Sequence, residues 1–339
     1  MYMDNEFKKQ LDGKTVIITG GTGSLGQALT KKLLKTGVKT IRIFSRNENK
    51  QVNMEANFHD DRLRFFIGDI RDLSRLNRAF EDVDIVFHAA ALKHVPVVEY
   101  NPFEAIKTNV IGSQNVIDAC LHENVETAIA VGTDKAVSPL NTYGATKLLM
   151  EKLFVSANSF LNPEKHKTKF VALRYGNVLA SSGSVLPKFL DLARNGKKIT
   201  ITDPNMTRFS LTMDEALNFI LSSTFASKGS EVFIPKLRAY SIMDLKKAVT
   251  DLLGNPGDII TSIRPGEKLH ETLINSDEIP YTWEFENNYV IFNPLKTESQ
   301  IQNQYPGIKK AIFSSSYSSN SVEKIPIDEL KKIISTMNS

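Results

Sequence analysis

The sequence predicts an α/β fold, built from a doubly wound parallel sheet and a smaller second domain. Short apolar, β-branched runs alternate with helical stretches through the first half, which is typical of parallel strands joined by crossover helices. A glycine-rich turn joins the first run to the first helix, and Pro and Gly interrupt shorter segments in the second half. We therefore expect a sheet domain over 1–176. Residues 177–339 should form mainly the second domain, with some segments returning to the first.

The individual elements follow from periodicity and chain punctuation. In the first half we expect strands over 15–19, 40–44, 63–67, 84–88, 128–131 and 170–173. Between them we expect helices over 27–36, 105–124 and 143–158. In the second half we expect a buried helix over 216–227, a loop or surface tail over 314–321 and a last helix over 327–337.

Composition narrows the class of protein. The chain has 339 residues, of which 41% are hydrophobic and 24% charged, and this suits two globular domains. Its 42 basic and 38 acidic residues give a net charge of +4. The basic residues are spread along the chain without a dense cluster, so nucleic acid is not an expected partner.

Two further observations indicate the compartment. No apolar run approaches the ~20 residues of a membrane span, and the first residues lack the apolar core of a signal peptide. A membrane is therefore not an expected partner. Cys120 is the sole cysteine, so the chain cannot form an internal disulfide. We expect a reducing compartment, the cytoplasm.

The glycine-rich turn carries the first functional signal. In Thr19-Gly-Gly-Thr-Gly-Ser-Leu-Gly26, three glycines have the spacing GxxGxxG between a strand and a helix. Glycines allow a tight turn and close approach of a pyrophosphate, which the free N–H groups of the helix N-terminus attract. This context predicts a Rossmann-type dinucleotide-binding domain and disfavours a turn without a ligand. The expected contacts are Gly20, Thr22, Gly23, Ser24, Leu25 and Gly26.

The end of the second strand indicates which dinucleotide binds. An acidic residue there is typical of NAD sites, because it binds the ribose 2′-OH. Here Ser45 and Arg46 come first and Lys50 follows, and arginine suits a 2′-phosphate. We therefore expect NADP, although Glu48 keeps NAD open. Asp69 and Ile70 follow the third strand, where they are placed to contact the adenine.

A cluster of reactive side chains follows the fifth strand. Thr133, Asp134 and Lys135 lie where the carboxyl ends of parallel strands bind ligands. Tyr143 and Lys147 are four residues apart on the next predicted helix and so share a face. An ammonium group beside a phenol lowers the phenol pKa, which makes Tyr143 a workable acid or base.

Together these motifs resemble the extended short-chain dehydrogenase/reductase superfamily. Within it, the Asp-Lys pair at 134–135 is similar to that of inverting UDP-N-acetylglucosamine 4,6-dehydratases. The segments 89–102, 206–209 and 263–271 also match, and the resemblance extends from Gly13 to about Asn293. Gly132 departs from the family, which usually has Ser there.

The resemblance implies a role for each reactive residue. Tyr143 would take the O4 proton during oxidation at C4, with Thr133 positioning the hydroxyl and Lys147 binding the nicotinamide ribose. Lys135, if neutral, would remove the C5 proton, and Asp134, if protonated, would release water from C6. Hydride return to C6 and protonation at C5 from the opposite face would give the L-arabino 4-keto sugar.

The resemblance also implies binding residues and partners. UDP-N-acetylglucosamine is the implied substrate, and the implied assembly is a homo-oligomer, either a dimer or a hexamer. Asn109 would hold a water near Lys147 or be a satisfied buried polar group. Arg208 is equally well interpreted as a structural hydrogen bonder or a surface charge. The implied cofactor contacts are Ala89, Ala90, Ala91 and Asn109, and the implied substrate contacts are Lys93, Asn177, Thr202, Arg208 and Arg264.

Two alternatives remain open from the sequence. A UDP-sugar 4-epimerase or reductase would use Tyr143 and Lys147 without needing Lys135. A non-catalytic NADP-binding sensor would keep the glycine turn, although it would not need the reactive cluster.

Overall fold

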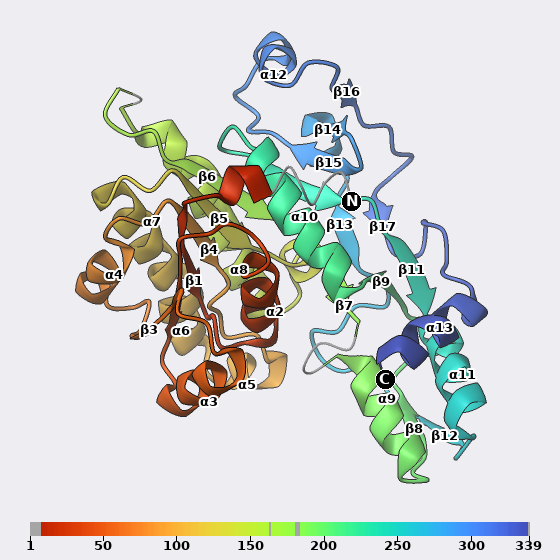
Figure 1. The fold of residues 1–339 in the computed structure, drawn as a ribbon. Coiled ribbons are helices and arrows are strands. Elements are labelled where there is room, and N and C mark those ends of the chain that lie inside the picture. The colour runs from red at the N-terminus through yellow and green to blue at the C-terminus, as the bar shows by residue number, and fades with distance from the viewer. Residues whose placement is uncertain (1–7, 163, 180–183, 338–339) are drawn as a thin grey trace.

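A computed structural model describes residues 8–162, 164–179 and 184–337. It confirms the predicted fold class (Figure 1). The main sheet has the strand order β16-β14-β15-β10-β6-β5-β4-β1-β2-β3. Its strands are β1 (Thr15–Thr19), β2 (Thr40–Ser45), β3 (Leu63–Ile67), β4 (Ile85–His88), β5 (Thr127–Val131), β6 (Lys169–Leu173), β10 (Val232–Pro235), β14 (Thr282–Phe285), β15 (Asn288–Ile291) and β16 (Lys309–Lys310).

Helices cover both faces of this sheet because successive strand residues point to opposite sides. Val16 and Ile18 pack with α2 (Ser24–Leu33), α3 (Glu48–Phe58) and α10 (Met213–Ala226). Ile17, between them, packs on the other face. The helices there are α4 (Leu73–Phe80), α7 (Gly112–His122) and α8 (Thr142–Ala157).

The strand order indicates which edge of the main sheet binds ligands. From β3 to β10 neighbouring strands run parallel, and the order reverses between β1 and β4. Ligands of such sheets bind at the carboxyl ends of the strands near this reversal. The glycine turn follows β1 and the Thr133–Lys135 segment follows β5, so both lie at that edge.

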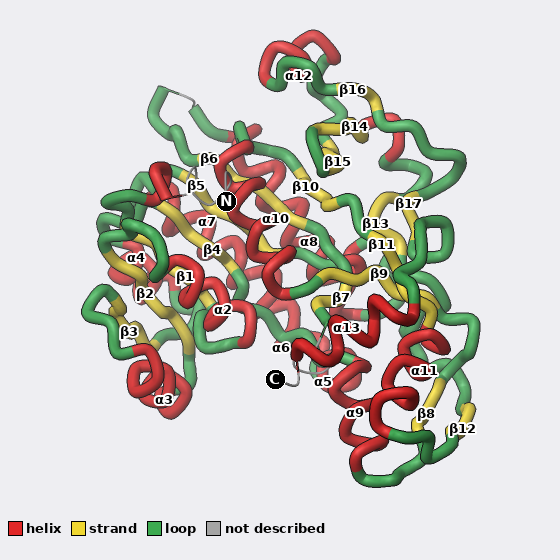
Figure 2. Tube along the Cα trace, turned by 45° about the vertical axis from the view of Figure 1, so that its right-hand side comes forward, coloured by secondary structure: helices red, strands yellow, loops and turns green. Residues whose placement is uncertain are grey.

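The second half of the chain divides between the main sheet and a separate lobe. Strand β10 pairs parallel with β6, and β15, β14 and β16 continue the main sheet antiparallel. The lobe has its own hydrophobic core and is seen in Figure 2. It contains α9 (Val185–Arg194), β8 (Ile199–Ile201), α11 (Ile242–Leu253), β12 (Asp258–Ile260) and α13 (Ile327–Met337).

Short strands join the lobe to the main sheet. They are β7 (Asn177–Val178), β9 (Thr207–Leu211) and β11 (Arg238–Ser241) in one small sheet, and β13 (Thr272–Ile274) with β17 (Tyr317–Ser318) in another. The remaining helices are α5 (Val95–Tyr100), α6 (Pro102–Ala105) and α12 (Glu298–Gln304).

Two sequence-based expectations were wrong. The helix expected over 105–124 is interrupted by a π-helical turn, Ile106–Ile111, between α6 and α7. The tail expected over 314–321 contains β17, which pairs antiparallel with β13. That pairing joins segments far apart in sequence, so the polar composition of the tail could not reveal it. Among the residues described, no helix is long and apolar enough to cross a membrane.

Candidate functional site

The glycines of the turn after β1 differ in how closely other backbone atoms surround them. A Cβ on Gly20 would lie 2.8 Å from the backbone nitrogen of Ala90, and one on Gly26 would lie 2.4 Å from the Gly21 carbonyl oxygen. The fold therefore requires both. A Cβ on Gly23 would meet only the Gly20 carbonyl oxygen, at 3.2 Å. This contact is looser than those at Gly20 and Gly26, and Gly23 is exposed, so its backbone is open to close approach by a ligand.

The N-terminus of α2 is suited to an anion. Gly23 precedes the helix and provides no capping side chain, and the first turn carries no acidic residue. Gly23 and Ser24 are exposed, Leu25 is half-buried and Thr22 is buried. Uncapped N–H groups and the helix dipole favour phosphate here. The chain thus fits the pyrophosphate of a dinucleotide.

The expected ribose contacts lie at the end of β2. The Arg46 guanidinium is half-exposed and 3.9 Å from the Asp69 carboxylate, which Arg71 also binds. Lys50 is exposed in the first turn of α3. Ser45 is buried and accepts a hydrogen bond from Gln51. Arg46 and Lys50 are therefore the cations available to a 2′-phosphate here.

Ile70, an expected adenine contact, packs its side chain into the core. The Ile70 side chain is buried in the hydrophobic core, where a Cβ on Gly112 would lie 2.7 Å from its Cδ1. The Ile70 carbonyl accepts a hydrogen bond from Asn115. Ile70 thus has a structural role whether or not a ligand contacts it.

The loop after β4 is linked to helix α8 through hydrogen bonds of Asn109. Asn109 accepts a hydrogen bond from the Leu92 backbone N–H at 2.8 Å and donates to the Leu92 carbonyl at 2.9 Å. Its other amide hydrogen reaches the Thr146 hydroxyl at 3.0 Å. Of the two interpretations of Asn109, these contacts support a buried polar group whose hydrogen bonds are satisfied. The Ala89 N–H bonds Thr19, and Ala89–Ala91 are half-buried beside the glycine turn.

The reactive cluster assembles just beyond β5. The Asp134 carboxyl is 1% exposed, and its Oδ1 accepts from the Thr133 hydroxyl at 2.8 Å and from Lys135 Nζ at 3.1 Å. Tyr143 begins α8, whose N-terminus Asn141 caps. Burial and the Asp134 charge raise the pKa of Tyr143, while Lys135 and a hydrogen bond with Thr133 lower it. The four side chains thus form one coupled group.

The structure corrects the expected role of Lys147. Its ammonium group is buried and donates to the Val131 carbonyl at 2.6 Å and contacts the Met150 sulfur at 3.0 Å. It is not among the charges that shift the pKa of Tyr143; the cation that does so is Lys135. Burial lowers the pKa of Lys147 to about 7, against the charge of Glu151.

Lys135 also differs from expectation. We expected burial and nearby cations to lower its pKa so that it could act as a base. Burial does lower it, but the carboxylates of Asp134 and Glu271 raise it above its ordinary value. Its Nζ lies 3.1 Å from Asp134 and 3.4 Å from Glu271. Without a ligand, Lys135 is therefore a cation held between two anions.

Two of the expected substrate residues join this cluster. Arg208 is buried, donates to the carbonyls of Thr207 and Leu269, and lies 3.8 Å from Glu271. The surface-charge interpretation is wrong, because β9 runs through the interior, whereas the two carbonyl bonds fit a structural hydrogen bonder. Asn177 hydrogen-bonds the buried Tyr240, whose pKa is raised by burial and also responds to Arg208, Lys135 and Asp134.

The other three expected substrate residues are Thr202, Arg264 and Lys93. The Thr202 hydroxyl contacts the Met206 sulfur at 3.2 Å. Arg264 and Lys93 are exposed. In the described part of the chain, Thr202 and Arg264 make no hydrogen bond or ion pair with Asp134 or Lys135.

Sequence reasoning missed two buried members of the site. Glu271 ends the matched segment 263–271, yet no motif spacing marked it as a partner of Lys135. Tyr240 lies on β11 and had no signal beyond its residue type. His88, interpreted from the sequence as a core residue, is buried between Thr19 and Ser113.

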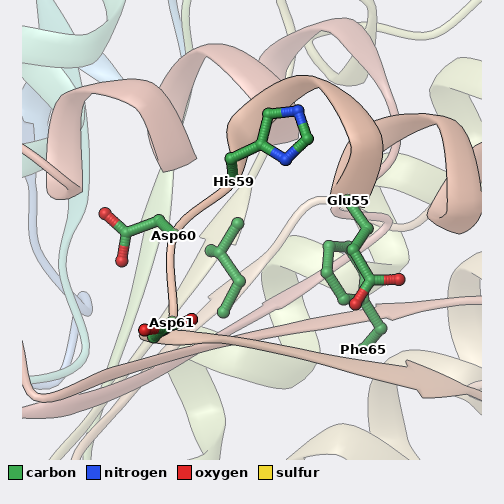
Figure 3. A pocket seen from close by; sticks show the side chains of 6 residues that line it. Glu55, His59, Asp60, Asp61 and Phe65 are labelled. Carbon is green, nitrogen blue, oxygen red and sulfur yellow. The ribbon is translucent and has the colours of Figure 1, made fainter.

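The hollow in Figure 3 lies elsewhere. It has a volume of about 220 Å³ and opens where α3 ends and β3 begins, at the opposite edge of the sheet from the reactive cluster. It is lined by Glu55, His59, Asp60, Asp61, Leu63 and Phe65. No group of three or more potential metal ligands occurs among the described residues.

Comparison with known proteins places the chain in a family. A family model described as polysaccharide biosynthesis protein matches residues 16–293. The chain belongs to this polysaccharide biosynthesis protein family.

Members and relatives of the family carry different activities. An inverting UDP-N-acetylglucosamine 4,6-dehydratase of Campylobacter jejuni subsp. jejuni serotype O:23/36 is 48% identical, over 85% of this chain and 86% of its own. A UDP-glucose 4-epimerase of Rickettsia conorii is 38% identical over 96% of each chain. The X-ray structure of Pen from Bacillus thuringiensis has 36% identity and a TM-score of 0.89, covering 97% of this chain and 99% of its own.

Proposed function

We propose that this protein is a UDP-N-acetylglucosamine 4,6-dehydratase that inverts C5 and uses NADP. The observation that carries the proposal is the contact of Lys135 with Asp134 beside Thr133 and Tyr143. Water elimination needs a base at C5 and an acid at C6, and this pair supplies both at one place. The 48% identity to inverting dehydratases over most of the chain supports it.

The first step is oxidation at C4. Tyr143 takes the O4 proton, and Lys135 together with the Thr133 hydroxyl stabilises the phenolate. We assign the nicotinamide ribose to Lys147, which in the ligand-free protein donates to the Val131 carbonyl at the end of β5. A bound dinucleotide supplies the two-electron oxidation at C4 and the later reduction at C6.

The second step is elimination of water. One proton passing from Lys135 Nζ to Asp134 Oδ1, along the existing 3.1 Å contact, produces an amine and a carboxylic acid together. The amine removes the C5 proton, which the 4-ketone acidifies. The acid protonates the C6 hydroxyl, the C–O bond breaks and a C5–C6 double bond forms. The pair ends charged as it began. As reduction at C6 follows, a solvent proton adds to C5 from the opposite face and inverts that centre, and Tyr143 releases the O4 proton to solvent.

The choice of NADP over NAD rests on Arg46 and Lys50. Both cations are exposed at the end of β2, where a 2′-phosphate would lie. The lone, buried Cys120 is consistent with the reducing cytoplasm that we propose as its compartment.

We also propose a homo-oligomer, a dimer or a hexamer. Large apolar side chains are exposed on neighbouring helices, and monomers rarely expose such groups together. They are Val97 and Tyr100 on α5, Phe103 on α6 and Leu149 on α8. Sedimentation equilibrium of the wild type and of Tyr100→Glu tests this. Association that the charge weakens supports the proposal, and a wild-type monomer contradicts it.

The reaction is tested by proton NMR of the protein with UDP-N-acetylglucosamine and NADP⁺ in D₂O. We expect a 6-deoxy-4-keto product carrying deuterium at C5, with couplings of the inverted configuration. Unchanged substrate, or a C4 epimer alone, would contradict the proposal.

A UDP-sugar 4-epimerase is the second candidate, favoured by the Rickettsia relative that matches 96% of the chain. Lys135→Ala separates the two. An epimerase uses Tyr143, Lys147 and the dinucleotide, and it retains C4 epimerisation in this variant, more slowly because Lys135 no longer stabilises the Tyr143 phenolate. A dehydratase loses C5 exchange and water elimination.

A further inference from the structure

Glu271 is a buried carboxylate that faces the reactive cluster from the second half of the chain. Its side chain is 4% exposed. Its Oε1 lies 3.4 Å from Lys135 Nζ and 3.8 Å from Arg208 Nε. Glu271 Oε1 therefore lies between Lys135, the proposed C5 base, and Arg208, an expected substrate contact.

The other oxygen of Glu271 has no protein partner. Oε2 is buried and accepts no hydrogen bond from the described residues, and the same is true of Asp134 Oδ2. Buried polar atoms are nearly always paired, because an unpaired one loses its hydration without compensation. Both carboxylates contact Lys135 through their first oxygen. The site thus presents two unused acceptors around the ammonium of Lys135.

Ser319 holds the backbone of Glu271 through two hydrogen bonds. The Ser319 hydroxyl accepts from the Glu271 N–H at 2.9 Å, and the Ser319 N–H donates to the Glu271 carbonyl at 2.8 Å. The Ser319 hydroxyl also bonds Thr207, next to Arg208. These bonds hold the backbone of Glu271, and its carboxylate extends from there to Lys135 and Arg208.

We propose that Glu271 is a positioning residue of the dehydratase: Oε1 orients Lys135 and Arg208, and Oε2 accepts a hydrogen bond from a hydroxyl or amide N–H of the bound hexose. This proposal rests on the proposed function and adds a sugar contact to it. A sugar donor at Oε2 shares the negative charge of Glu271 and weakens its hold on Lys135. Binding of the hexose thereby favours the proton transfer from Lys135 Nζ to Asp134 Oδ1 that prepares elimination.

Several charged or titratable groups surround Lys135 and Glu271, and each bears on a pH test. Asp134, Arg208 and Tyr143 act on Lys135, and Tyr240 and Lys268 respond to its charge. Lys268 also responds to Glu271. Only removal of Glu271 takes away an anion that Lys135 and Arg208 both contact.

The test compares Glu271→Gln with Glu271→Asp and with Glu267→Gln. Glu267 is a matched control because it approaches Arg208, at 3.5 Å, from a more exposed position and contacts none of the groups proposed to react. Dehydration and C5 deuterium exchange of UDP-N-acetylglucosamine are followed by NMR as a function of pH. Thermal melting establishes that each variant is folded.

We expect Glu271→Gln to lower kcat about 10- to 100-fold and to raise KM, since a hydrogen bond to a charged acceptor is lost. The acid limb of its pH profile should move to lower pH, because Lys135 loses a neighbouring anion. Glu271→Asp, which keeps the charge, should return the limb toward the wild-type position. Glu267→Gln should change kcat by less than about two-fold, because Glu267 is more exposed than Glu271 and, unlike Glu271, is not paired with Lys135.

Two results would overturn the inference. One is a Glu271→Gln variant with wild-type kcat and KM. The other is a loss of activity with an unmoved acid limb in both Glu271 variants, which would indicate a structural role alone. If Glu271→Gln does not fold, Glu271→Asp decides, because its shorter side chain withdraws the carboxylate from the hexose; a folded Glu271→Asp variant with wild-type kcat and KM would then overturn the inference. Failure of the wild type to dehydrate the substrate would instead contradict the proposed function.

Discussion

The ammonium group of Lys147 donates a 2.6 Å hydrogen bond to the backbone carbonyl of Val131, the last residue of β5. This contact joins helix α8 to the end of β5, which the Thr133–Lys135 segment follows. It also explains why Lys147 does not act on Tyr143 in the ligand-free protein. Helical spacing places the two residues on one face, but the long side chain of Lys147 is directed into the sheet.

The buried Lys147 makes the stability of the protein depend on pH. Its pKa falls from 10.5 to about 7 on folding, so between these values the unfolded chain binds a proton that the folded chain does not. Stability should therefore rise with pH across this window. We expect the free energy of unfolding of the wild type, relative to Lys147→Met, to increase from pH 7 to pH 10. Urea unfolding of both ligand-free proteins measures it, and a constant difference would contradict the assigned burial effect.

Asp134→Asn should separate the two halves of the reaction. The amide can still accept hydrogen bonds from Thr133 and Lys135 but cannot protonate the C6 hydroxyl. We expect water elimination to fall at least about 100-fold, the usual contribution of a general acid, while transient reduction of NADP⁺ at C4 persists. Absorbance at the reduced nicotinamide band and NMR of the product measure the two steps. Equal loss of both would refute the assignment of Asp134 as the acid.

The glycine turn offers a matched pair of substitutions. A Cβ at position 23 meets only one atom, at 3.2 Å, so Gly23→Ala should fold and weaken dinucleotide binding by at least about 10-fold. Gly26→Ala places a Cβ 2.4 Å from the Gly21 carbonyl oxygen and should lower the melting temperature instead. Calorimetric titration with NADP⁺ and thermal melting distinguish them. Unchanged affinity in Gly23→Ala would argue against a pyrophosphate there.

Arg46→Ala tests the choice of dinucleotide. The side chain is exposed, so the substitution should leave stability within about 0.5 kcal/mol of the wild type. We expect the ratio of NADP to NAD affinity to fall about 10-fold, since a charge-assisted contact with the 2′-phosphate is lost. Titration with both dinucleotides measures the ratio. A ratio that does not change would assign NADP selectivity, if present, to other residues.

A buried ionic triad behind the site should be important for stability. The Arg174 guanidinium binds Glu151 of α8 and Glu278, each at 2.6 Å, and both Arg174 and Glu151 are 1% exposed. Arg174→Met leaves the Glu151 carboxylate buried and unpaired, which costs about 3–5 kcal/mol. Urea unfolding measures the loss. A combined Glu151→Leu, Arg174→Met variant should recover part of it, because neither charge then remains unpaired.

Much of the first half could be predicted from the sequence because its signals are local. The strand 15–19, the glycine turn and the position of Tyr143 depend on neighbours within a few residues, and the structure has them within a residue of expectation. The π-helical turn at Asn109 could not be predicted. Within this turn Asn109 pairs with Leu92, a contact that periodicity does not reveal.

The site shows the same division between local and distant information. Thr133, Asp134 and Lys135 are adjacent in sequence, and a parallel sheet necessarily places residues after β5 at its ligand edge. Their order along the chain therefore determined that an acid and a cation would meet there. Only the tertiary structure decided their charge states, because pKa values depend on burial and on neighbours from any part of the chain. Glu271, brought by the β13–β17 pairing from 136 positions beyond Lys135, keeps that lysine charged where burial alone would have lowered its pKa.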